Sequence, residues 1–149
     1  MGASVGISQF PHDGNSVEQL IQNADAALYD AKASGRRTFR FYTSTLTARA
    51  KARLSLETKL RRALERNEIL LHYQPQVNIR TGKIVGVEAL ARWPDGDQMI
   101  PPDQFVPVAE ESGLILPLGQ SLFRKACMQA RQWNDAGISL MVAVNLSAR

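Results

Sequence analysis

The segment 43–67 contains neither glycine nor proline, and it constrains the fold more than any other feature of the sequence. It is rich in Ala, Leu, Arg, Lys and Glu, which favour helix, so it predicts one long helix. Leu46, Arg53, Leu60 and Asn67 recur every seven residues in an imperfect heptad. This pattern favours a connecting helix and leaves pairing with a second copy open. We therefore expect three parts: 1–42, a linker helix at 43–67, and 68–149.

The basic charge of the chain is concentrated in this helix. The segment holds seven basic and two acidic residues, a net charge of +5, whereas the whole chain carries +4. A solvated linker explains this charge better than binding to nucleic acid or to a membrane surface. No apolar run approaches the roughly 20 residues that span a bilayer, and the single cysteine, Cys127, excludes an internal disulfide. We expect a cytoplasmic chain, with an upstream membrane anchor in a longer parent left open.

The first part has the pattern of a small α/β piece. Residues 4–10 and 38–42 are short and alternating, which predicts strands. Between them, apolar residues at spacings of three and four predict an amphipathic helix. Ser16 and Gln19 have the spacing of a capping box at its start, and Gly35 can end it in a left-handed turn.

The second part predicts strands at 69–77 and 84–93, joined by a turn at 80–83. Pro94-Asp95-Gly96 predicts a break after the second strand. Helices are expected at 103–112, interrupted near Pro107, and at 118–136. The near-continuous apolar run 140–146 predicts a strand buried on both sides in a parallel sheet. This order of elements indicates an α/β architecture.

Side chains alternate between the two faces of a strand, and this parity groups the polar residues. Glu88 and Arg92 fall on one face of the strand 84–93, and the opposite face is apolar. Gln74 and Asn145 lie on the more polar faces of their own strands. A barrel with polar groups clustered at its mouth is typical of this pattern.

Two chemical interpretations of these residues stay open at this point. Glu88 and Asn145 offer hard oxygen ligands suited to Mg²⁺ or Mn²⁺, and Gln74 and Arg92 can hold a phosphate or a base edge. Alternatively, Glu88 forms an ion pair with Arg92 across one position. The residues by themselves favour the ion pair, because such pairs are common in sheets.

Several motifs of the second part resemble the EAL family in order and spacing over 60–149. They are Tyr73-Gln74-Pro75, Gly86-Val87-Glu88-Ala89-Leu90-Ala91-Arg92-Trp93, Pro102-Asp103-Gln104-Phe105-Val106-Pro107-Val108-Ala109-Glu110, Gly113-Leu114-Ile115 and Val144-Asn145-Leu146-Ser147. The resemblance implies a modified (β/α)₈ barrel that hydrolyses cyclic di-GMP to pGpG with two divalent cations, Mg²⁺ or Mn²⁺. It implies that Glu88 is a catalytic metal ligand and Asn145 a second ligand. Gln74, Leu90 and Arg92 fall at positions that contact the dinucleotide.

The first part resembles the C-terminal third of a GGDEF, or diguanylate cyclase, domain over about 3–42. The motifs are Ala3-Ser4-Val5-Gly6-Ile7, Pro11-His12-Asp13-Gly14, Ala24-Asp25-Ala26-Ala27-Leu28-Tyr29-Asp30-Ala31-Lys32 and Gly35-Arg36. Lys32 and Arg36 fall where family members contact the GTP phosphates, and Arg37 replaces the usual Asn. No Gly-Gly-Asp-Glu-Phe segment is present, so we expect no cyclase activity.

The resemblance implies a tandem GGDEF–EAL protein and leaves two functions open. A complete barrel needs about 250 residues, and the later family carboxylates would follow Arg149, so we expect this chain by itself to be inactive. The leading interpretation is a cyclic di-GMP phosphodiesterase. The alternative is a non-catalytic module that binds cyclic di-GMP for regulation. A homodimer through the linker or the EAL part is also expected.

Overall fold

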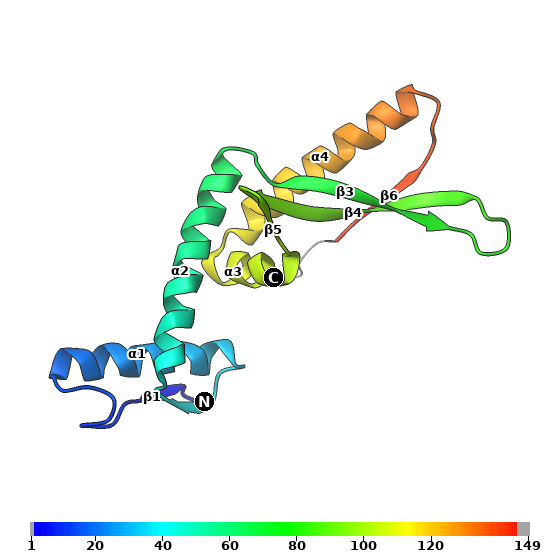
Figure 1. Ribbon diagram of the computed structural model, residues 1–149. Helices are drawn as coiled ribbons and strands as arrows, with labels where there is room; N and C mark the ends of the chain where they lie inside the picture. The colour runs from blue at the N-terminus through cyan, green and yellow to red at the C-terminus, as the bar shows by residue number, and fades with distance from the viewer. Residues whose placement is uncertain (1, 146–149) are drawn as a thin grey trace. The chain divides into compact units, whose positions relative to one another are not determined.

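The computed structural model describes residues 2–145, and the chain divides into two compact units, Met1–Ser55 and Leu56–Arg149. The first unit contains β1 (Val5–Ile7), α1 (Val17–Ala33), β2 (Phe39–Phe41) and the start of α2 (Ser44–Glu65) (Figure 1). The second holds the rest of α2, then β3 (Leu70–Val77), β4 (Ile84–Asp95), β5 (Gln98–Ile100), α3 (Pro102–Ser112), α4 (Ile115–Asp135) and β6 (Met141–Val144). The expected mixed α/β architecture is confirmed.

In the first unit, β1 and β2 form a parallel pair, and α1 packs against both strands. The predicted start of α1 is confirmed. The Ser16 hydroxyl accepts from the Gln19 amide at 3.2 Å, and the Gln19 side chain accepts from the Asn15 amide at 2.9 Å. Gly35 follows the helix with a φ of 104°, and the Arg36 amide donates to the Ala31 carbonyl at 3.2 Å.

Strand β1 is shorter than the predicted strand 4–10. It ends at Ile7, because the residues that follow bond to one another instead of to a neighbouring strand. The Gln9 amide donates to the Asp13 carboxylate, and the Asp13 amide donates to the Gln9 carbonyl, both at 2.7 Å. A local turn therefore replaces the end of the predicted strand.

The long helix predicted at 43–67 is confirmed as α2, and it ends in a left-handed turn. Asn67 has a φ of 57°, a conformation that Asn tolerates better than most residues. The Glu68 amide donates back to the Ala63 carbonyl at 2.9 Å. This is the hydrogen-bonding pattern of a Schellman cap, so the end of the helix is set by its own sequence.

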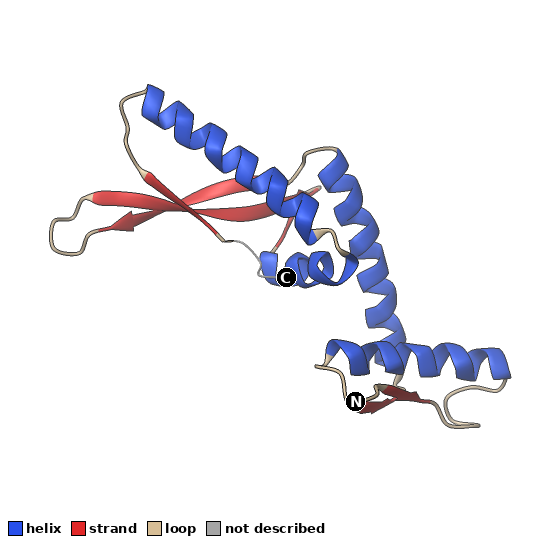
Figure 2. Ribbon diagram, turned by 180° about the vertical axis from the view of Figure 1, so that it is seen from behind, coloured by secondary structure: helices blue, strands red, loops and turns tan. Residues whose placement is uncertain are grey.

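The sheet of the second unit is centred on β4. This strand pairs antiparallel with β3 and β5 and parallel with β6. Helix α4 lies along one face of the sheet, where it contacts β3 and β6, and α3 contacts β4 (Figure 2). The helices thus cover one face of the sheet.

Two predicted interruptions are absent from the structure. Strand β4 continues through Pro94 to Asp95, turns at Gly96, which has a φ of 62°, and returns as β5. Beyond Arg92 the strand no longer pairs with β3, and sheets tolerate proline where a strand has one neighbour. Helix α3 runs through Pro107 without a break, because Phe105 and Ala109 on either side are buried and tertiary packing holds the helix.

The prediction that the strand 140–146 is buried on both sides is wrong for the described part. Met141 is 68% exposed, and Val142 is half-buried. Within residues 2–145, β6 pairs with β4 alone and forms an edge of the sheet. The apolar run 140–146 is typical of a strand covered on both faces, and the described part of β6 lacks that cover. Leu146 lies outside the described residues.

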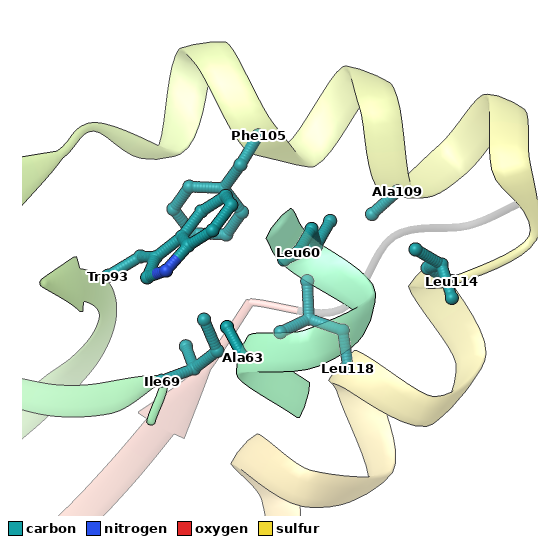
Figure 3. Close-up of a cluster of buried hydrophobic side chains, with 8 residues drawn as sticks. All are labelled: Leu60, Ala63, Ile69, Trp93, Phe105, Ala109, Leu114 and Leu118. Carbon is teal, nitrogen blue, oxygen red and sulfur yellow. The ribbon is translucent and has the colours of Figure 1, made fainter. Parts of the chain in front are cut away.

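The core of the second unit joins α2 to the sheet and to both other helices. Figure 3 shows the buried cluster, which consists of Leu60, Ala63, Ile69, Trp93, Phe105, Ala109, Leu114 and Leu118. The rings of Trp93 and Phe105 meet edge to face with centroids 5.6 Å apart. Lys59 on α2 also forms a 2.6 Å ion pair with Asp95 on β4. The second half of α2 is therefore part of the core.

Lys125 on α4 fixes the turn between α2 and β3, a contact that no sequence pattern indicated. Its ammonium donates to the Asn67 carbonyl at 3.2 Å and also to the Ile69 carbonyl. Partial burial lowers the pKa of Lys125, and the two carbonyls favour the charged form. The partners lie more than fifty residues away in the chain, so only the tertiary structure reveals them.

We expect Leu60→Ala to lower the free energy of unfolding of the second unit by about 2–5 kcal/mol, because it leaves a cavity beside Trp93. Leu54→Ala on the same helix is the matched control. Leu54 is 67% exposed, so its loss should cost under about 0.5 kcal/mol. Urea unfolding followed by tryptophan fluorescence measures both. Equal losses in the two variants would contradict this account of the core.

We expect Gly86→Ala to weaken the pairing of β4 with β6. A Cβ atom at Gly86 would lie 2.9 Å from the Met141 carbonyl oxygen, too close without a shift of β6. Hydrogen exchange at the β6 amides should accelerate. The control is Gly119→Ala in α4, where a Cβ meets nothing within 4 Å. That change should stabilise the chain by about 0.5–1 kcal/mol, and unchanged β6 exchange in Gly86→Ala would refute the prediction.

Candidate active site on the open face of the sheet

The two faces of the sheet differ in burial, as the parity of the strands predicted. Leu71 and Tyr73 on β3 are half-buried, whereas His72 and Gln74 are exposed. On β4, Val87, Ala89 and Trp93 are buried under the helices. We call the side that carries His72, Gln74 and Glu88 the open face and the other side the covered face. The polar side chains of β3, β4 and β6 thus lie together on the open face.

The register of the strands orders the open face into rows. Gln74 lies opposite Glu88, and Glu88 lies opposite Ala143. The next row lies two residues further toward the carboxyl ends of β4 and β6. In it, His72 lies opposite Leu90. Asn145 follows Val144, the partner of Ala89, so it reaches the same row as Leu90. The outermost row pairs Leu70 with Arg92.

Glu88 and Asn145 are in direct contact although 57 residues separate them in the chain. The Asn145 side-chain amide donates to a Glu88 carboxylate oxygen at 2.6 Å. Glu88 is half-buried and Asn145 is exposed. The contact turns the two side chains toward each other and leaves the Asn145 Oδ1 atom to accept from, or bind to, another group. Parallel pairing of β4 with β6 creates this contact.

The alternative in which Glu88 forms an ion pair with Arg92 is wrong. The Arg92 guanidinium donates instead to the Ala91 carbonyl at 2.8 Å. Among the described residues, no ion pair joins Arg92 to Glu88. The carboxylate therefore has no basic side chain to neutralise it within this part of the chain, which suits a site for a cation.

Two hard oxygen donors form part of the coordination sphere of Mg²⁺ or Mn²⁺, which take about six ligands. Within the described range there is no group of three or more His, Cys, Asp or Glu side chains that could hold a metal ion. Glu88 and Asn145 fit a divalent cation in ligand type, and they supply only a share of its ligands.

Tyr73, the neighbour of Gln74 in the first motif, lies on the covered face and holds β3 against a helix. Tyr73 packs edge-on against Trp133 of α4, with ring centroids 4.8 Å apart, and its partial burial raises the pKa of the phenol. Tyr73 therefore anchors β3 to α4, and its neighbour Gln74 faces the opposite side.

A cavity of about 600 Å³ lies between the sheet and helices α3 and α4. Its walls are mainly apolar and include Leu71, Ala89 and Ala91 from the covered face, and Asn145 reaches its edge. Glu88, Gln74 and Arg92 do not line it. Leu90 and Asn145 also line it, so the cavity reaches one row of the open face but not the row of Gln74 and Glu88.

The candidate residues of the first unit lie at the end of α1. Lys32 is in its last turn, and Arg36 follows Gly35 with a φ of 61°. Both side chains are exposed. Across the described residues, no helix is both long enough and apolar enough to cross a membrane.

Comparison with known proteins identifies both parts of the chain. Residues 57–149 match the family model described as the EAL domain. Residues 1–38 match the model described as the diguanylate cyclase GGDEF domain. The two matches follow each other in the order that the motifs predicted.

Curated relatives align over nearly the whole chain. The bifunctional diguanylate cyclase/cyclic di-GMP phosphodiesterase MucR of Pseudomonas aeruginosa is 45% identical over 99% of this chain and 22% of its own length. The cyclic di-GMP phosphodiesterase PdeR of Escherichia coli is 44% identical over 98% of this chain, again 22% of its own length. The chain thus spans about a fifth of these relatives.

Solved structures agree with the fold. The PaMucR phosphodiesterase in a c-di-GMP complex aligns with a TM-score of 0.60 at 47% identity, over 63% of this chain and 39% of that one. The Xanthomonas citri FimX EAL domain in complex with c-diGMP aligns with a TM-score of 0.58 at 26% identity, over 66% and 38%. The strands and helices of the second unit are therefore the first elements of an EAL-type barrel. The chain belongs to the EAL domain family, with GGDEF domain sequence ahead of it.

Proposed function

We propose that the EAL part of this chain contributes to a phosphodiesterase that hydrolyses cyclic di-GMP to pGpG with the help of divalent metal ions. The observation that carries the proposal is the 2.6 Å contact between Glu88 and Asn145. These side chains come from separate strands and meet on the open face. Family membership and the relatives named as phosphodiesterases support the same reaction.

Glu88 and Asn145 have the role of metal ligands in this proposal. EAL phosphodiesterases depend on divalent metals, and the two oxygen donors are suited to Mg²⁺ or Mn²⁺. A pair of such ions supplies a nucleophilic water and neutralises phosphate charge. The Glu88 carboxylate would bind through its oxygens, and Asn145 through Oδ1.

Gln74, Leu90 and Arg92 are proposed to contact the dinucleotide. Gln74 lies in the row of Glu88, Leu90 in the next row and Arg92 at the outer edge of the sheet. One N–H of the Arg92 guanidinium donates to the Ala91 carbonyl. Its remaining N–H groups suit a forked contact with phosphate. Leu90 offers an apolar surface for a base.

The domain division 1–42, 43–67 and 68–149 is retained as a proposal, with α2 as the connection. The second half of α2 packs into the core around Trp93, so it also belongs structurally to the EAL part. Self-association through α2 or the EAL part, and phosphate contacts by Lys32 and Arg36, are predictions of the same kind. Without a Gly-Gly-Asp-Glu-Phe segment, these 149 residues should show no cyclase activity.

We expect Glu88→Gln in the full-length polypeptide that contains this chain to lower kcat for cyclic di-GMP at least about a hundredfold, because an amide replaces a charged ligand. Asp97→Asn is the matched control, since Asp97 is an exposed acid in the turn between β4 and β5. Chromatographic detection of pGpG measures both. Binding of cyclic di-GMP by the wild type without cleavage would replace the proposal with the receptor function.

The 149 residues assayed alone with cyclic di-GMP and Mn²⁺ should give no sustained pGpG production. Glu88 and Asn145 provide too few ligands to hold two ions in catalytic geometry. Steady turnover that increases linearly with the concentration of the chain would show that the described ligand set suffices.

A further inference from the structure

His72 lies on the open face in the same row as Leu90 and Asn145. It pairs directly with Leu90 across the antiparallel β3–β4 ladder, and residues that face each other in such a ladder point to the same side. Its side chain is exposed, unlike those of Leu71 and Tyr73 on either side. The sequence pattern singled out no role for this histidine, because the row exists only after β3 has paired with β4.

Among residues 2–145, no contact holds the imidazole of His72 in place for structural reasons. In the described part of the chain, no hydrogen bond, ion pair or ring contact engages its side chain. The imidazole N–H of His72 is therefore available to donate to a ligand, and the neighbouring Leu90 offers that ligand an apolar surface. It lies one row outward from Gln74 and Glu88 and level with Asn145, so a ligand that reaches the proposed metal ligands passes beside it.

The dimensions of the row suit one nucleotide. Neighbouring strands lie about 4.8 Å apart, so the row runs about 10 Å from His72 on β3 to Asn145 on β6. A nucleotide whose phosphate lies beside Glu88 and Asn145, and whose base lies over Leu90, brings the base edge toward β3. Guanine presents the acceptor O6, which adenine lacks, beside N7, which both purines carry, and an imidazole N–H can donate to O6.

We propose that His72 donates a hydrogen bond to O6 of a guanine base in the bound dinucleotide and thereby strengthens recognition of guanine. This inference rests on the proposed function for the substrate but concerns a different residue and a different part of the ligand. His72 acts in binding, so its loss changes KM rather than kcat.

The test compares His72→Ala, His72→Phe and His72→Gln in the full-length polypeptide that contains this chain, with steady-state hydrolysis of cyclic di-GMP as the assay. We expect KM to rise about tenfold in the Ala and Phe variants, which lack a donor, with kcat within about twofold of the wild type. The Gln variant retains an N–H donor and should recover part of the loss. Gln76→Ala is the matched control, because Gln76 shares the strand and the face but lies opposite Gly86, away from the proposed site.

Competition with cyclic di-AMP separates a contact with the base from a contact with phosphate. Adenine keeps N7 but carries an amino donor in place of O6, so loss of a contact to O6 in His72→Ala should leave the inhibition constant of cyclic di-AMP within about twofold. Equal weakening of both dinucleotides, or an unchanged KM for cyclic di-GMP, would overturn the inference. If the wild type binds cyclic di-GMP without cleaving it, the proposed hydrolysis fails, and Kd from calorimetry then tests His72 by the same comparison.

Discussion

Strand β4 carries both the core and the candidate site, because side chains on a strand alternate between its two faces. Trp93 points to the covered face, where it packs against Phe105 of α3. Glu88 points to the open face, where it meets Asn145. The packing that buries one face fixes the register of the strand, and a slip of one residue would turn Glu88 into the core. The position of the carboxylate therefore depends on the burial of Trp93.

Helix α2 belongs to both units in a physical sense. Leu46 in its first half is buried within Met1–Ser55, and Leu60 and Ala63 are buried within Leu56–Arg149. The seven-residue spacing that hinted at a coiled coil thus places Leu46 and Leu60 inside the chain's own cores. Arg53, between them, stacks over the Tyr29 ring at 5.5 Å in the first unit. Each half of α2 thus contributes side chains to the packing of its own unit, which a fully solvated helix would not.

Much of the candidate site follows from the alternation of residues and could be predicted. Glu88 and Arg92 share a face whatever the sheet does, and the motifs around Gln74 and Asn145 indicate the family. Alternation alone could not say which side chains touch, since a pattern within one strand says nothing of its neighbours, and only the family resemblance placed Glu88 and Asn145 at one site. The residue pattern without the resemblance favoured an ion pair between Glu88 and Arg92, four residues apart. The structure pairs Glu88 with Asn145 across the β4–β6 ladder and directs Arg92 to the Ala91 carbonyl.

The sequence by itself determined the elements whose signals are local. The Ser16 cap, the left-handed turn at Gly35 and the uninterrupted α2 follow from backbone preferences of neighbouring residues. Tertiary structure decided everything that depends on contacts between distant segments. It carried α3 through Pro107, extended β4 past Pro94, joined Lys125 to the turn after α2, and placed His72 beside Leu90. Packing and strand pairing bring together residues far apart in the chain, and local preference carries no information about such partners.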